Sequence, residues 1–125
     1  MKILESAENY LETILVLKNK NGSVRSIDVA NELGFTKPSV SIAMKQLREN
    51  GYITVDADGS LNLTDSGKAV AERVFERHNV IAKALMALGV DEETAYSDSC
   101  KIEHHISDTS VRKIKEYFEK KQSEN

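Results

Sequence analysis

The sequence predicts a mainly α-helical protein: an N-terminal winged helix-turn-helix with a two-stranded wing, followed by an all-helical domain. Three observations support this fold class. Apolar residues recur at helical spacing along most of the 125 residues. A glycine-containing turn joins two short helices within the first 50 residues. Two short strand-like segments joined by turn residues follow directly.

The first two helices are predicted from their apolar periodicity and their end signals. The first covers residues 5–17, and the polar run 19–22 ends it. Ser26 can cap a short second helix that reaches Leu33. Gly34 then supplies the C-terminal turn.

A third helix opens at Thr36, and Pro38 is tolerated in its first turn. Asn50 and Gly51 end it. Its inward-facing residues are Val40, Ala43, Met44 and Leu47. Because only a tight glycine turn separates it from the second helix, the pair forms a helix-turn-helix, whose second helix usually lies in the major groove of DNA.

A hairpin follows this pair. Residues 52–55 read as a strand, residues 56–59 are turn residues, and residues 60–63 alternate as the second strand. A helix-turn-helix followed by such a hairpin is typical of a winged helix. Asp56 and Asp58 stand at the tip, where a wing that grips phosphates needs lysine or arginine, so we expect the wing to add little affinity.

Three more helices are predicted after the wing. Thr64 can cap a long helix that ends at Gly89, a second covers about residues 90–105, and the last begins at Asp108. The long helix exceeds what the winged module needs, so a domain boundary near residues 72–75 lies inside it. We expect a homodimer, because apolar residues beyond that boundary exceed what a winged helix can cover. They are Val74, Phe75, Ile81, Leu85 and Met86.

The composition is that of an ordinary soluble protein, with 40% hydrophobic and 30% charged residues and no apolar tract long enough to span a membrane. Glu5 and Glu8 interrupt the segment where a signal peptide needs an apolar run. The single cysteine, Cys100, excludes an internal disulfide and fits a reducing compartment. We therefore expect a cytoplasmic protein without a membrane partner.

The third helix carries a locally basic surface although the net charge of the chain is -3. Lys37, Lys45 and Arg48 face only one acid there, Glu49. An isolated helix of this kind could equally be a solvated surface, but its place between the turn and the hairpin favours double-stranded DNA. The residues predicted to contact DNA are Thr36, Lys37, Pro38, Ser39, Ser41, Ile42 and Lys45.

A candidate metal site lies near the C-terminal end of the 90–105 helix. Cys100, Glu103 and His104 have spacings that place a thiolate, a carboxylate and an imidazole on one helix face. Such a set suits Fe(II), Zn(II), Co(II) or Ni(II), and the carboxylate also allows Mn(II). Three ligands do not fill a coordination sphere. The candidates for the remaining positions are His78, Asn9 and Glu12.

Each of these residues also has a purely structural interpretation. A single cysteine is more often a small buried hydrophobic residue than a ligand. A single histidine is more often hydrogen-bonded, and a single glutamate such as Glu12 is more often solvated. His105 points about a quarter turn away from His104 and is not predicted to bind metal.

Together these motifs resemble the diphtheria-toxin-repressor and manganese-transport-regulator group of metal-dependent bacterial repressors. The resemblance covers nearly the whole chain. Its residues are Glu8–Glu12, Thr36–Gly51, Leu63–Gly67, Arg77–His78 and Cys100–His104. It implies a winged-helix DNA-binding domain over residues 1–72 and a helical metal-binding and dimerisation domain over residues 73–125, in the short form that lacks the SH3-like domain.

The resemblance also implies a ligand set. His78, Glu103 and His104 match metal ligands, and Glu12 matches a ligand of the manganese branch. Cys100 matches the iron branch, where the manganese branch has a carboxylate. Asn9 stands where the branches carry methionine or aspartate. The implied cofactor is therefore Fe(II) or Mn(II), and residues matching the iron branch's second site, Tyr96 and Ala82, do not suit a copy of it.

By this resemblance the protein is expected to repress transcription by binding an inverted-repeat operator as a dimer when it is loaded with metal, and thereby to control metal homeostasis. One alternative is a metal-independent winged-helix repressor that senses an organic ligand. Another is a metallohydrolase, which needs an open coordination position, a substrate cleft and a general base. The chain has no zinc-protease helix motif and little room for a large pocket, so we do not expect an enzyme.

Overall fold

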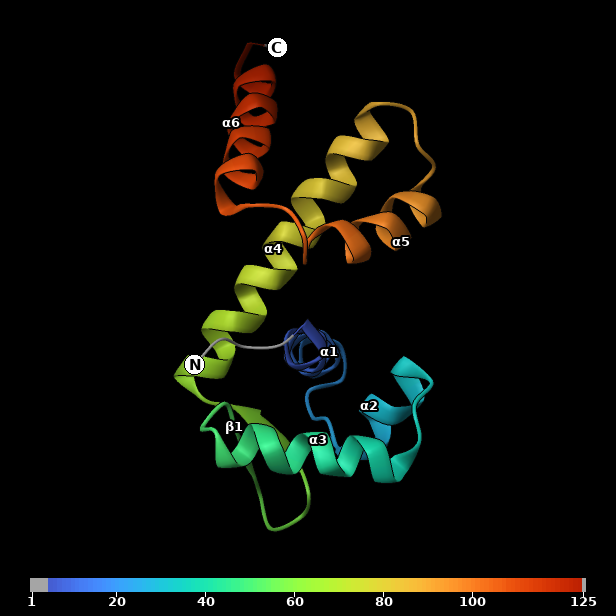
Figure 1. Ribbon diagram of the computed structural model, residues 1–125, viewed down its shortest axis with the longest axis vertical. Helices are drawn as coiled ribbons and strands as arrows, with labels where there is room; N and C mark the ends of the chain where they lie inside the picture. The colour runs from blue at the N-terminus through green and yellow to red at the C-terminus, as the bar shows by residue number, and fades with distance from the viewer. Residues whose placement is uncertain (1–4, 125) are drawn as a thin grey trace. The chain divides into compact units, whose positions relative to one another are not determined.

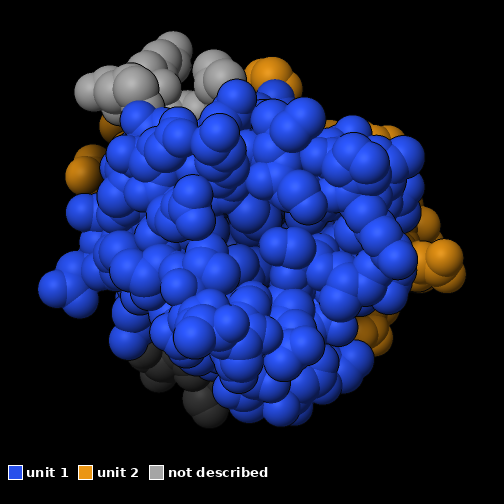
Figure 2. Space-filling view, turned by 90° about the horizontal axis from the view of Figure 1, so that it is seen from below, with its two compact units in different colours: residues 1–73 blue, residues 74–125 orange. Residues whose placement is uncertain are grey.

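The computed structural model describes residues 5–124, and the side chains of residues 5–121. Figure 1 shows the elements, and Figure 2 colours the two compact units into which the chain divides, residues 1–73 and 74–125. The described elements confirm the mainly α-helical fold class with a two-stranded wing. In chain order they are α1 (Glu5–Asn21), α2 (Ser26–Leu33), α3 (Lys37–Glu49), β1 (Ile53–Val55), β2 (Leu61–Leu63), α4 (Asp65–Ala87), α5 (Glu92–Ile102) and α6 (Asp108–Glu124).

The first unit is built around the helix-turn-helix. Its core contains fully buried side chains from α1, α2, α3 and both strands. The largest of them are Leu11, Ile14, Val29, Val40, Ile53 and Leu61. Helix α1 is four residues longer than predicted, because the polar residues 19–21 continue it until Gly22, whose positive φ of 84° ends the helix.

The turn between α2 and α3 fixes the direction of α3. Gly34 has a φ of 70°, as a left-handed C-terminal residue requires, and the Phe35 N–H donates to the Ala30 carbonyl at 3.0 Å. The predicted cap of α2 was one residue off. Arg25 occupies the N-cap position, and its N–H donates to the Asp28 carboxylate at 2.9 Å, so Ser26 is already helical.

The wing is an antiparallel pair in which Ile53 is opposite Leu63 and Val55 is opposite Leu61. Gly67 holds the start of α4 against this hairpin. A side chain at position 67 would place its Cβ atom 2.0 Å from the Tyr52 carbonyl oxygen, so only glycine allows this approach. Thr64 caps α4 as predicted, since its hydroxyl accepts the Gly67 N–H at 3.2 Å.

The second unit consists of the C-terminal part of α4 together with α5 and α6 (Figure 1). Ile81, Ala82, Ala95 and Val111 are buried in it. Asp91 caps α5 by accepting the Thr94 N–H at 3.0 Å, and this hydrogen bond lowers the pKa of Asp91. No helix within residues 5–124 is long and apolar enough to cross a membrane.

Candidate metal centre and nucleic-acid interface

Four of the predicted metal ligands lie together in the second unit. His78 projects from α4, and Cys100 from the last turns of α5. Helix α5 ends at Ile102, three residues earlier than predicted, so Glu103 occupies its C-cap and His104 lies in the following turn. The expectation that Cys100, Glu103 and His104 share a helix face was therefore wrong for the last two. The turn, rather than the helix, carries the carboxylate and its imidazole neighbour.

The distances between donor atoms are short. The Cys100 sulfur lies 3.5 Å from His78 Nδ1 and 3.6 Å from His78 Nε2. His78 Nδ1 is 3.5 Å from Glu103 Oε2, and His104 Nε2 is 3.5 Å from Glu103 Oε1. Donor atoms bound to one transition-metal ion at about 2.1 Å lie roughly 3.0–3.4 Å from each other. Each of these pairs, taken by itself, therefore lies near the spacing of two ligands of one ion.

Burial distinguishes this cluster from a surface group of charges. The side chains of Glu103 and His104 are only 1% and 3% exposed, and that of His78 is 16% exposed. A buried carboxylate needs a positive partner, which a divalent cation or a protonated imidazole supplies. Cys100 is exposed and leaves the cluster open on one side. A thiolate, two imidazoles and a carboxylate are a donor set that fits a divalent transition metal.

Arg77 holds the turn that carries these ligands, a role that the sequence analysis missed. Its guanidinium is 8% exposed and donates to the Glu103 carbonyl at 2.7 Å from Nη2 and 3.2 Å from Nε. It also donates to the Ile106 carbonyl and pairs with Asp108 at the start of α6. The sequence does contain one indication of this role, because Arg77 directly precedes the predicted ligand His78.

The two remaining predicted ligands belong to the first unit. Glu12 and Asn9 lie on α1, and both are half-buried. The Asn9 carbonyl accepts a hydrogen bond from the Thr13 hydroxyl at 2.8 Å. His105 is exposed in the turn after α5, and the Tyr96 ring packs against the His78 ring at a tilt of 47°, with 5.4 Å between ring centroids.

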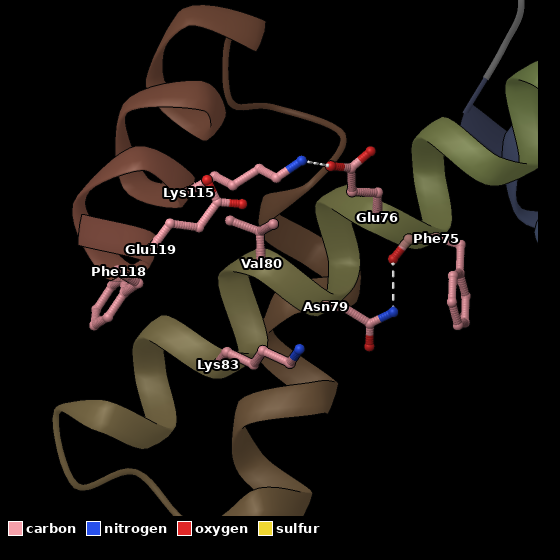
Figure 3. A pocket seen from close by; sticks show the side chains of 8 residues that line it. All are labelled: Phe75, Glu76, Asn79, Val80, Lys83, Lys115, Phe118 and Glu119. Atoms are coloured by element: carbon pink, nitrogen blue, oxygen red, sulfur yellow. Dashed lines mark hydrogen bonds and ion pairs between the residues drawn. The ribbon is translucent and has the colours of Figure 1, made fainter. Parts of the chain in front are cut away.

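A separate cavity of about 410 Å³ lies between α4 and α6 and contains none of the predicted ligands (Figure 3). Phe75, Val80 and Phe118 form apolar parts of its wall. Lys115 and Glu76 form an ion pair at its edge, and this contact raises the pKa of Lys115. The cavity is thus apolar with charged groups around it, and it differs in chemistry from the metal cluster.

The residues predicted to contact DNA are all exposed, at the N-cap of α3 and along its outer surface. Thr36 caps the helix, with its hydroxyl accepting the Ser39 N–H at 3.4 Å and donating to the Ser39 hydroxyl at 2.8 Å. A small hollow beside α3 also includes Ser26, Arg48 and Val55. Arg48 adds a cation to this surface beyond the predicted contact residues.

The wing presents acidic groups at its tip. The Ser60 N–H donates to the Asp58 carboxylate at 3.0 Å, and this hydrogen bond lowers the pKa of Asp58. Asp58 therefore stays ionised at neutral pH. A negative tip disfavours close contact with phosphates, in line with the small role expected for the wing.

Two family models match almost the entire chain. One is described as the N-terminal DNA-binding domain of iron-dependent repressors and matches residues 2–61. The other is described as the metal-binding and dimerisation domain of iron-dependent repressors and matches residues 64–124.

Individual relatives agree with these matches. The HTH-type transcriptional regulator MntR of Bacillus velezensis is 35% identical over 121 residues, which cover 94% of this chain and 85% of that protein. An HTH-type transcriptional regulator of Methanocaldococcus jannaschii is 32% identical over 118 residues, which cover 93% of this chain and 94% of that protein. The solved structure of a manganese-dependent transcriptional repressor in complex with manganese is similar at a TM-score of 0.79 and 25% identity, covering 86% of this chain and 50% of that one. The chain therefore belongs to the iron-dependent repressor family of transcriptional regulators.

Proposed function

We propose that this protein represses transcription in the cytoplasm by binding an inverted-repeat operator as a homodimer when it is loaded with Fe(II) or Mn(II), and that it thereby controls metal homeostasis. The observation that carries this proposal is the position of His78 in the second unit, where its Nδ1 lies 3.5 Å from the Cys100 sulfur and 3.5 Å from Glu103 Oε2. The family consists of transcriptional regulators, so the protein is not an enzyme, and the metallohydrolase alternative is excluded.

We infer that His78, Cys100, Glu103 and His104 bind the metal, which supplies positive charge for the thiolate and the carboxylate. Imidazole and thiolate suit Fe(II), whereas carboxylate and amide oxygens suit Mn(II). Glu12 and Asn9 are proposed as further oxygen ligands, on the basis of the sequence. The proposed domains are residues 1–72 for DNA binding and residues 73–125 for metal binding and dimerisation.

A metal that is bound both by Glu12 and by residues of the second unit must restrict the freedom of one unit relative to the other. The DNA-bound dimer needs its two copies of α3 at a fixed separation, about one helical turn of DNA or a multiple of it. Metal binding that favours this arrangement is coupled to DNA binding, and such coupling is typically worth about 1–3 kcal/mol. Without metal, carboxylates of Glu12 and Glu103 that approached each other would repel, which would act in the opposite direction.

The homodimer needs an apolar surface that the single chain leaves exposed. Two of the apolar residues predicted to be in excess, Val74 and Ile81, are only 2% and 4% exposed. They therefore belong to the core of the single chain. The exposed apolar residues of the second unit include Leu88 at 80% and Tyr117 at 54%. They border a groove of about 490 Å³ whose walls are almost entirely apolar. We propose that a second copy of the chain covers this groove.

The proposal is tested by selecting DNA from a random duplex pool with the purified protein in the presence of Mn(II), of Fe(II) without oxygen, or of a chelator. We expect enrichment of an inverted repeat with metal and none with chelator. Enrichment that is equal with chelator overturns the metal-dependent function. It favours instead a repressor of the organic-ligand type, for which the cavity between α4 and α6 is the candidate site.

A further inference from the structure

Ile42 is the most exposed large apolar side chain of the first unit within the part of the chain that the structure describes. Its side chain is 61% exposed, in the middle of α3. The helix has its own buried residues, Val40, Met44 and Leu47, all 5% exposed or less. Ile42 is therefore not part of the stripe that packs α3 into the core.

The helical rotation of about 100° per residue places Ile42 opposite that buried stripe. Pro38, four residues earlier, and Lys45, three residues later, share its outward direction, and both are exposed. The surface of α3 that points farthest from the core thus begins with two apolar side chains and continues with a cation. In a helix-turn-helix, the N-terminal part of this surface contacts base edges.

At the start of α3, the hydroxyl groups of Thr36 and Ser39 are hydrogen-bonded to each other. The Thr36 hydroxyl donates to Ser39, and it accepts the Ser39 N–H as the helix cap. Pro38 has no N–H to donate. Lys37 and Lys45 carry point charges, which suit phosphates better than base edges. The outermost position at this end of α3 therefore offers van der Waals contact rather than hydrogen bonds.

Single exposed apolar residues are common on protein surfaces and need no explanation by themselves. Ile42 differs because it lies inside a polar and basic surface, on the helix that the proposed function places in the major groove. Helix formation does not explain it either, since isoleucine is a poorer helix former than alanine at an exposed position. The remaining role for the Ile42 side chain is a contact with another molecule.

We propose that Ile42 reads thymine, by van der Waals contact with the 5-methyl group of a thymine base in each half-site. The thymine methyl is the one apolar feature among the base edges of the major groove, and apolar side chains recognise it. This inference rests on the proposed function and adds to it the identity of a base. By this inference Ile42 contributes to the sequence specificity of DNA binding, whereas Lys37 and Lys45 contribute to its affinity.

The experiment uses the duplex selected by the wild-type protein and replaces its thymines, one position at a time, by deoxyuridine, which lacks only the 5-methyl group. Wild-type affinity is expected to fall about fourfold when the contacted thymine of either half-site is replaced, as the loss of one buried methyl contact implies, and roughly fifteenfold when both are replaced. Ile42→Ala is expected to lose this dependence, binding the thymine and uracil duplexes equally. Because Ile42 is exposed, this variant keeps its fold, which its melting temperature checks.

Val16→Ala is the matched control, since Val16 is an exposed apolar residue of α1 at 38% exposure. It should retain the full effect of uracil. The inference is overturned if no thymine position is sensitive to uracil, or if Ile42→Ala is as sensitive as the wild type, and in both cases metal-dependent DNA binding still stands. If no duplex is selected with any metal, the proposed function itself is wrong and the assignment of Ile42 is wrong with it.

Discussion

The guanidinium of Arg77 binds the backbone carbonyl of Glu103 through two N–H groups, so a buried arginine on α4 fixes the residue that follows α5. The side chain of this same Glu103 is 1% exposed and lies 3.5 Å from an imidazole on each of its oxygens. The backbone of Glu103 and its side chain therefore have different roles. Arg77 holds the backbone of the ligand turn, and the side chains of this turn supply candidate donor atoms for a metal.

Arg77→Met should therefore weaken both the fold and the metal site. It leaves the Glu103 and Ile106 carbonyls without their donor, which costs about 2–4 kcal/mol in the free energy of unfolding. Metal affinity should fall about tenfold or more, as is usual when a group that orients a ligand is lost. Urea unfolding and calorimetric titration with Mn(II) measure the two effects. Arg73→Met is the control, because Arg73 is an exposed residue one turn earlier that pairs with Glu8, and it should leave metal affinity unchanged.

Lys37→Ala and Lys45→Ala should each weaken binding to the selected duplex without changing metal affinity. If each lysine contacts one phosphate, the slope of log K against log salt becomes shallower by about one unit. Fluorescence anisotropy at several salt concentrations measures this slope. Lys120→Ala, at an exposed position in the second unit, should leave it unchanged. An unchanged slope for both α3 variants means that another surface of the helix faces DNA.

Metal affinity should decrease as pH falls. Binding needs the thiolate of Cys100 and neutral imidazoles at His78 and His104, so protons compete with the metal. Calorimetry in buffers of different ionisation enthalpy measures the protons released. The control is His105→Ala, which alters an exposed histidine outside the cluster and should release as many protons on metal binding as the wild type. If the wild type releases no protons on metal binding, the ligand assignment is wrong.

Glu12→Gln should separate metal binding from the response to metal. The variant keeps the size of the side chain and leaves the ligands of the second unit intact, so it should fold, dimerise and still bind some metal. It should lose much of the metal-dependent gain in DNA affinity. Glu5→Gln, an exposed position on the same helix, is the control. A Glu12→Gln variant that responds to metal like the wild type shows that Glu12 is not a ligand.

Much of the fold could be predicted from the sequence because its signals are local. The helical periodicity of Val40, Met44 and Leu47, the glycine turn at Gly34 and the cap at Thr64 all depend on neighbouring residues. The errors are also local in origin. Asp28 accepts the Arg25 N–H and moves the start of α2, and the polar residues 19–21 extend α1 to Asn21.

The site was only partly predictable for a different reason. Helical spacing brought Cys100, Glu103 and His104 to attention, but the end of α5 at Ile102 depends on contacts that Arg77 makes 26 residues away in the chain. No local pattern contains that contact. The burial of the carboxylate likewise follows from packing, which residue type alone does not determine.

The central claim, that metal switches DNA binding, is tested most directly by the affinity of the wild-type dimer for its selected duplex with saturating Mn(II) or Fe(II) and with a chelator. The account predicts an increase with metal of about 5- to 150-fold. By linkage, the duplex must raise metal affinity by the same factor, which a titration of the protein–DNA complex measures. Equal DNA affinity with metal and with chelator contradicts the account.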